Sequence, residues 1–212
     1  SAWVVRVTYI LAYAELVAAT NYSFLRGASH PADMVHRAHR LGMSGLGIAD
    51  RNSVAGVVRA WVAVKKAKAE NALPEGFRLV TGSRLVFADG TPDIVAYPKN
   101  RKGWGRLTRL LTVGNMRSNK GGCILRFDDL AGYLEDLLLI ILPQSTAEET
   151  NPHKKPVEYN HADGGEKLRL VEATPADLDE VMLRLKKLAP DRVWLGIYMH
   201  GRGKDRRRLE EQ

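Results

Sequence analysis

Residues 45–50 read Gly45-Leu46-Gly47-Ile48-Ala49-Asp50, a short apolar run that ends at a carboxylate. An apolar run of this length predicts a buried strand. A helix capped by Ser53 is expected to follow it, with apolar side chains at helical spacing on one face. The residues expected on that face are Val54, Val57, Val58, Trp61 and Val62.

Strand and helix patterns alternate on both sides of this unit. A strand is expected at 9–19 and a helix at 31–41 before it. After it, Asp89-Gly90 is a turn signal that predicts a hairpin between 84–88 and 93–97. Further on, helices are expected around 104–111 and 174–185, and strands at 137–142 and 193–199. Alternation on this scale indicates an α/β fold with mainly parallel strands.

A polar, irregular segment interrupts this alternation. The expected division is 1–142 for the first strand–helix units, 143–166 for a polar loop or insertion, and 167–212 for later units. Because the pattern at 206–211 begins a helix that the chain end cuts short, at least one further strand is expected beyond it.

Composition favours a protein of the reducing cytoplasm. The single cysteine, Cys123, excludes an internal disulfide. The longest apolar run, at 137–143, is far too short to span a bilayer, so no membrane association is expected.

The formal net charge of +8 is concentrated in one part of the chain. Between Ile94 and Phe127 there is no acidic residue, and eight cations attract phosphate backbones if they share a surface. A solvated surface without a ligand is the alternative interpretation. The cations are Lys99, Arg101, Lys102, Arg106, Arg109, Arg117, Lys120 and Arg126. The first five lie in and before an amphipathic helix and are the candidate nucleic-acid-binding residues.

Several stretches carry a resemblance to a known family. They include Phe24-Leu25-Arg26-Gly27-Ala28-Ser29-His30-Pro31, Gly47-Ile48-Ala49-Asp50-Arg51-Asn52-Ser53 and Tyr97-Pro98-Lys99-Asn100-Arg101. Together they resemble the front part of the PHP (polymerase and histidinol phosphatase) domain of C-family bacterial DNA polymerases, in particular the error-prone branch. The likeness covers about residues 13–142 and resumes weakly at 193–201.

The resemblance implies a distorted β/α (TIM-like) barrel, incomplete in this chain. Active members of the family hold a cluster of divalent metals, such as Zn or Mn, at the C-terminal ends of the strands, where the metals activate water for phosphoester cleavage. The polymerase domain of such proteins uses Mg.

The positions that align with the family's metal ligands are largely changed. The first His-x-His pair falls on Val17 and Ala19, a later His on Arg51, and an acidic position on Arg84. The residual candidates are Asp50 and a carboxylate at another His position, Asp93. Two ligands do not make a two- or three-metal centre, so neither a cofactor nor a catalytic residue is expected in this chain.

The resemblance therefore predicts a non-catalytic, structural domain of an error-prone (translesion) DNA polymerase. Its expected partners are the remaining polymerase domains of the same parent chain and, weakly and non-specifically, DNA. One alternative is a metal-dependent phosphoesterase or 3′–5′ proofreading exonuclease. Another is a free-standing basic DNA-binding module.

Other candidate groups are weaker. His36 and His39 share a helical face, but two imidazoles without a third ligand are more often surface residues. His200 follows an expected strand without a visible partner, and Cys123 lacks a histidine partner that would activate it.

Overall fold

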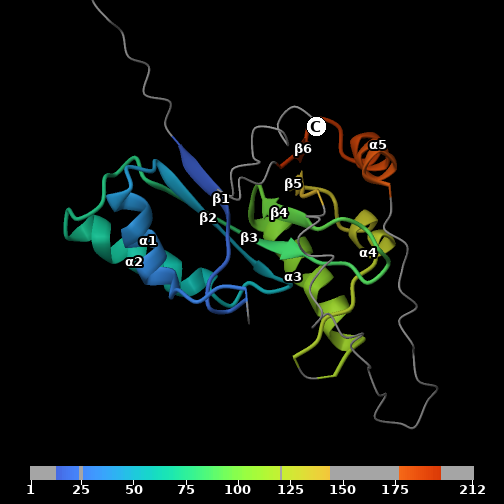
Figure 1. Cartoon of the computed structure of the whole chain (residues 1–212), viewed down its shortest axis with the longest axis horizontal. Helices are drawn as coiled ribbons and strands as arrows, with labels where there is room; N and C mark the ends of the chain where they lie inside the picture. The colour runs from blue at the N-terminus through green and yellow to red at the C-terminus, as the bar shows by residue number, and fades with distance from the viewer. Residues whose placement is uncertain (1–12, 24–25, 120, 144–176, 197–212) are drawn as a thin grey trace, which may run out of the picture.

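The computed structural model describes residues 13–23, 26–119, 121–143 and 177–196, in which six strands form one sheet (Figure 1). The strands are β1 (Ala14–Ala18), β2 (Gly45–Arg51), β3 (Arg78–Leu85), β4 (Ile94–Pro98), β5 (Leu137–Ile141) and β6 (Val193–Leu195). The helices are α1 (Pro31–Arg40), α2 (Val57–Ala69), α3 (Arg101–Met116), α4 (Phe127–Ala131) and α5 (Leu178–Leu188).

The strands are hydrogen-bonded in chain order, from β1 to β6. β1, β2 and β3 are parallel, β4 is antiparallel to both of its neighbours, and β5 and β6 are parallel. The expectation of mainly parallel strands holds for three of the five pairs in the described sheet, and the exception is β4. The predicted hairpin is the reason, because a connection through Asp89 and Gly90 is too short for the crossover that a parallel pair needs. Gly90 adopts the left-handed region there, with φ of 82°.

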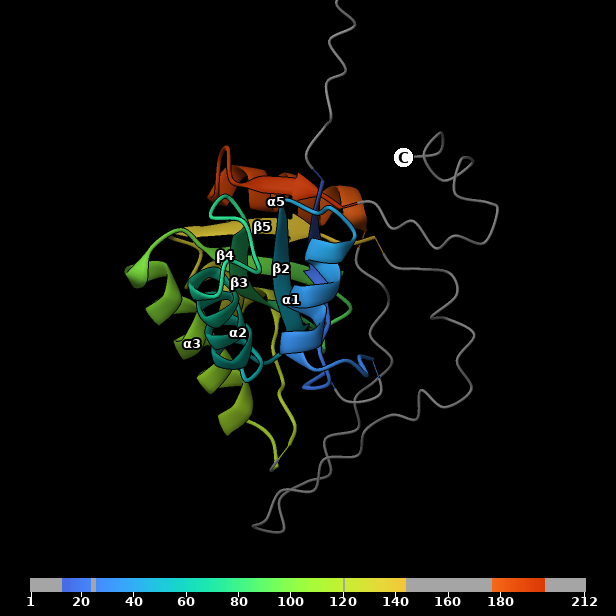
Figure 2. The same ribbon diagram turned by 90° about the vertical axis from the view of Figure 1, so that its left-hand side faces the viewer.

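All the described helices lie on one face of the sheet, which we call the outer face. There Leu46 and Ile48 of β2 pack with α1 and α2, while β3, β4 and β5 pack with α3, α4 and α5. Figure 2 shows α1 and α2 together in front of the strands. Side chains of alternate residues point to the opposite, inner face, where Ala49, Val95 and Tyr97 form a separate cluster. An inner cluster lined by strands, with helices outside, is the arrangement of a β/α barrel. The α/β class and the incomplete barrel are thus confirmed, with the sheet open in the described part.

Tyr97 ties four strands together on the inner face. Its hydroxyl donates to the carbonyl oxygen of Leu16 in β1, at 2.5 Å. The ring passes over two glycines in the strands between, because a Cβ on Gly82 of β3 would stand 2.6 Å from a ring carbon and one on Gly47 of β2 would stand 2.4 Å from the hydroxyl. Burial raises the pKa of Tyr97, so its hydroxyl remains a donor at neutral pH.

The sequence-based description of α2 needs two corrections. The helix begins at Val57, and the hydroxyl of Ser53 accepts a hydrogen bond from the amide of Ala55 in the preceding turn instead of capping the helix. Three of the five residues expected on one face lie outside the face that is buried. The buried face consists of Val57, Ala60, Val64 and Ala67, whereas Val58, Trp61 and Val62 point to solvent. Small alanines allow the backbone of α2 to approach the core closely, which the larger side chains do not.

The other predicted elements agree with the structure where it describes them. α1 begins at Pro31, β5 covers the expected buried run, and α5 buries Val181 and Leu185. Residues 144–176 and 197–212 lie outside the described residues. The start of the helix expected at 174–185, the loop at 143–166, the division around it and the position of His200 therefore stay predictions. Across the described ranges, no helix has the length and apolar character needed to cross a membrane.

Candidate site at the mouth of the barrel

The C-terminal ends of β1, β2 and β3 meet at one edge of the sheet because these strands are parallel. β4 is antiparallel to β3, so its start reaches the same edge, and Asp93 directly precedes it. Asp93 therefore lies at the same end of the strands as the residues of β1, β2 and β3 that align with the family's metal ligands. We call this edge of the inner face the mouth.

At the mouth Asp93 is held by an arginine. Nε of Arg84 and one of its terminal nitrogens each lie 2.6 Å from Oδ2 of Asp93. Both side chains are about three-quarters buried, which shields their charge-assisted contact from water. Arg84 therefore places a permanent positive charge beside this carboxylate.

Asp50 lies on the other face of the sheet. Ile48 packs on the outer face and Ala49 on the inner one, so the strand alternation turns Asp50 outward, away from the mouth. Its side chain is fully buried. The two residual ligand candidates are thus separated by the sheet itself.

The carboxylate of Asp50 fastens the loop that follows β1. Its oxygens accept hydrogen bonds from the backbone amide of Thr20 at 2.7 Å, the hydroxyl of Thr20 at 2.8 Å and the hydroxyl of Ser23 at 2.7 Å. Gly56 lies against it, since a Cβ there would stand 2.6 Å from Oδ2. This geometry assigns Asp50 a structural role that a strand-end position alone does not indicate.

Serines extend this hydrogen-bond network to β3. The hydroxyl of Ser83 donates to the carbonyl oxygen of Asp50 at 2.9 Å and accepts from the amide of Ser53 at 3.1 Å. The amide of Arg51 donates to the hydroxyl of Ser23 at 3.0 Å. The sequence reasoning missed Thr20, Ser23 and Ser83, and their only sequence signal is that small hydroxyl residues stand beside strand ends.

The residues at the mouth do not fit the metal cluster that the family implies. Within the described residues, no three His, Cys, Asp or Glu side chains gather where they could hold a metal ion. Val17 packs its methyl groups against the inner cluster. His36 and His39 lie on α1, on the outer face of the sheet. Burial raises the pKa of Cys123 to about 11, so this thiol stays protonated and is a poor ligand or nucleophile at neutral pH.

The basic surface of α3 is smaller than the sequence suggests. Leu107, Leu110 and Leu111 form the buried side of this amphipathic helix, and Trp104 is half-buried. Arg106 forms ion pairs with Asp136, at 2.9 Å, and with Glu135. Arg117 likewise binds Asp129. The exposed cations that remain in and before the helix are Lys99, Arg101, Lys102 and Arg109.

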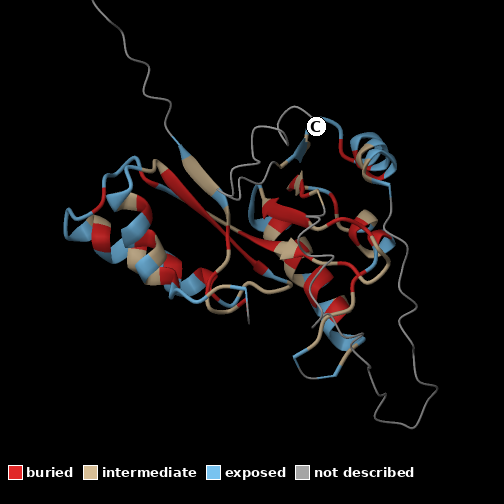
Figure 3. Ribbon diagram, in the orientation of Figure 1, coloured by how far each residue is buried: buried red, intermediate tan, exposed pale blue. Residues whose placement is uncertain are grey.

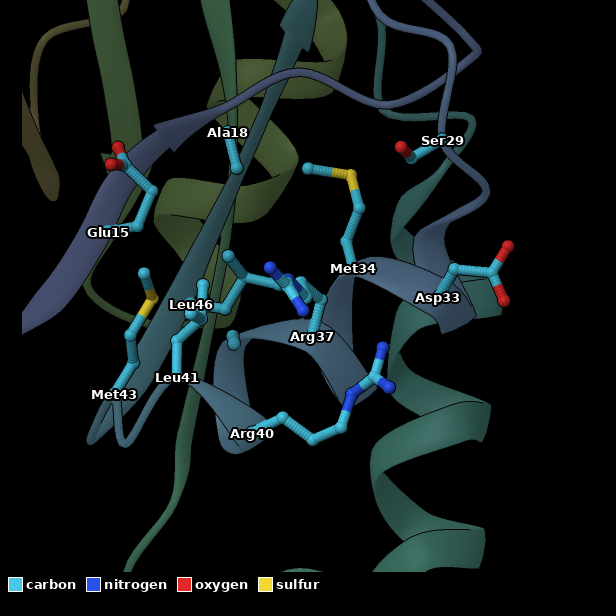
Figure 4. Close-up of a pocket in the computed structure, with 11 residues that line it drawn as sticks. Glu15, Ala18, Ser29, Asp33, Met34, Arg37, Arg40, Leu41, Met43 and Leu46 are labelled. Carbon is cyan, nitrogen blue, oxygen red and sulfur yellow. The ribbon is translucent and has the colours of Figure 1, made fainter. Parts of the chain in front are cut away.

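A pocket of about 410 Å³ opens between β1 and α1, and its lining is mainly apolar. Figure 4 shows Met34, Met43 and Leu46 around it. Its two carboxylates, Glu15 and Asp33, lie on opposite sides and point away from each other. They cannot share a proton or a metal, so the pocket offers no paired-carboxylate chemistry.

Comparison with known proteins identifies a protein family and similar polymerases. The family model described as PHP domain matches residues 15–197. Error-prone DNA polymerase 1 of Rhizobium meliloti (strain 1021) is 45% identical over 194 residues, which cover 92% of this chain and 14% of that protein. Error-prone DNA polymerase of Sinorhizobium medicae (strain WSM419) is 44% identical over 195 residues, with the same coverage. The chain thus spans about one-seventh of the length of these relatives.

A solved structure from Bifidobacterium adolescentis, described as a metal-dependent phosphoesterase, covers 59% of this chain. The chain covers 44% of that structure, with 20% sequence identity and a TM-score of 0.39.

Proposed function

Because the chain belongs to the PHP domain family, we propose that it is a PHP domain without its metal centre, with a structural role in an error-prone DNA polymerase. The observation that carries this proposal is the ion pair at the mouth, where Arg84 holds Asp93. Asp93 is the remaining candidate ligand on the inner face. The arginine beside it supplies a permanent positive charge, and this charge opposes metal binding.

The relatives' names support the second half of the proposal. Both are called error-prone DNA polymerase, and this chain matches only a small part of each. Polymerisation requires paired metal-binding carboxylates, and we place these in another domain of the parent protein. The rest of that polymerase chain is the proposed partner, translesion synthesis the proposed process, and the cytoplasm the proposed location.

A metal-dependent phosphoesterase or proofreading exonuclease is the alternative catalytic role. Such enzymes need metal ions to generate a nucleophilic water at neutral pH. Of the two residual ligand candidates, Asp93 is the one on the inner face, and Arg84 pairs with it. The donor set therefore favours the structural role.

Elemental analysis tests this proposal directly. After dialysis against zinc or manganese and removal of excess metal, we expect less than about 0.1 metal ion per chain, because a stable site needs three or four ligands. The same preparation should not hydrolyse p-nitrophenyl phosphate or single-stranded DNA above background.

One metal ion or more per chain, lost in Asp93→Ala but kept in Asp33→Ala, would contradict the proposal. Asp33 is the matched control because it is an exposed carboxylate on α1, outside the mouth.

A second role, weak DNA contact, is supported by the exposed cations Lys99, Arg101, Lys102 and Arg109. Since α3 buries its leucines against the sheet, these cations face solvent, where they can neutralise phosphates without reading bases. Duplex binding should be independent of sequence, and its log–log salt slope should be about −3 to −4 if four phosphates are engaged.

The double variant Arg101→Glu/Lys102→Glu should reduce this slope by about 2. The control Lys186→Glu/Lys187→Glu changes two exposed lysines on α5 and should leave the slope nearly unchanged. Fluorescence anisotropy at several salt concentrations measures both. Equal slopes for the two variants would exclude α3 as the DNA-contacting surface.

A further inference from the structure

α2 carries a second apolar stripe that no described part of the chain covers. Val58, Trp61 and Val62 recur at i, i+3 and i+4 and are 67%, 54% and 51% exposed. Figure 3 shows exposed and buried residues alternating along this helix. The opposite side of α2 packs into the core. Large apolar side chains grouped on one exposed helix face are typical of an interaction surface.

A groove between α1 and α2 lies beside this stripe. It encloses about 670 Å³, and Figure 2 shows the two helices side by side. Val58 and Val62 form part of its lining, together with Pro31, Ala63 and Ala67, and the carboxylates of Asp33 and Glu70 also line it. Side chains of a bound partner could therefore enter the groove while its backbone lies along the stripe.

The charges on α2 itself are positive. α2 contains four cations and no acid, and Lys66 and Lys68 are the two that pair with glutamates. The other two, Arg59 and Lys65, form no ion pair with any acid in the described ranges. Each faces a ring instead: Arg59 lies 6.0 Å from the ring centroid of Tyr22, and Lys65 lies 5.2 Å from that of Trp61. Uncompensated cations thus flank the stripe.

We infer that this face of α2, with the groove beside it, binds an acidic amphipathic helix of another protein. The partner's apolar side would cover Val58, Trp61 and Val62, and its carboxylates would pair with Arg59 and Lys65. Single-stranded nucleic acid fits less well, because Trp61 is the one ring on the stripe and valines offer no surface for base stacking. This inference does not depend on the proposed function, since α2 lies on the outer face of the sheet and the mouth belongs to the inner face.

The test uses the complete 212-residue chain and two synthetic helical peptides. Both peptides carry leucines along one face, flanked by glutamates in one and by lysines in the other. In fluorescence anisotropy we expect the glutamate peptide to bind at least about tenfold more tightly, because charge complementarity selects the partner. Val58→Ser/Trp61→Ser should weaken this binding at least about tenfold. Lys65→Glu leaves the stripe intact and should reduce the ratio between the affinities for the glutamate peptide and the lysine peptide.

The control Leu183→Ser/Leu188→Ser removes two exposed leucines from α5 and should not change peptide binding. Equal affinity for the two peptides, or no binding at about 1 mM peptide, would overturn the inference. The inference would also be overturned if the chain bound oligo(dT) and Val58→Ser/Trp61→Ser abolished that binding, because the stripe would then be a nucleic-acid-binding surface. Self-association of the chain that the same variant abolishes would assign it to a second copy.

Discussion

Replacing Asp50 with alanine is expected to lower the free energy of unfolding by about 3 kcal/mol. The carboxylate is fully buried and accepts hydrogen bonds from the amide and hydroxyl of Thr20 and from the hydroxyl of Ser23. Its removal would leave these donors without an acceptor in a site closed to water. Burying unpaired donors is unfavourable, and this accounts for most of the lost stability. Chemical denaturation measures the change.

Hydrogen exchange provides a local readout of the same variant. The amide of Thr20 should exchange much faster in Asp50→Ala, because its acceptor is gone. Glu75→Ala is the control, since this carboxylate is 89% exposed and its ion pair with Lys68 should contribute less than about 1 kcal/mol. If Asp50→Ala were as stable as Glu75→Ala, the structural role of Asp50 would be wrong.

The second large effect is expected from Gly82→Ala, which should destabilise the protein by about 3 kcal/mol. A Cβ at this position would stand 2.3 Å from the carbonyl oxygen of Ala96 and 2.6 Å from the ring of Tyr97. The first contact is with the backbone of the paired strand, so β3 and β4 must separate to accommodate it. Tyr97 would then lose its position across the inner face.

Gly105→Ala is the matched control for this substitution. No atom lies within 4 Å of a Cβ at Gly105, which stands inside α3. Alanine is the better helix former, so this variant should be more stable by about 0.5–1 kcal/mol. Thermal or chemical unfolding of both variants gives the comparison. A Gly82→Ala protein as stable as the unmodified chain would show that the inner face is not tightly packed.

Some features of this protein follow from its sequence alone. Apolar runs and turn residues predict the strands, the start of α1 at Pro31 and the hairpin at Asp89-Gly90, because these depend on local spacing and backbone preference. The absence of imidazole at Val17 and Ala19 is equally local: neither side chain can donate to a metal, wherever the fold places it.

Other features were decided by contacts between distant parts of the chain. α2 has two apolar stripes, and the sequence could not show that the one containing Ala60 and Val64 packs into the core. Strand alternation placed Asp50 on the outer face, and the antiparallel β4 brought Asp93 to Arg84. Two cations of the acid-free segment 94–127 likewise pair with acids that lie outside it: Arg106 with Glu135 and Asp136, and Arg117 with Asp129. Burial and charge pairing are properties of the surroundings in space, which sequence spacing does not specify.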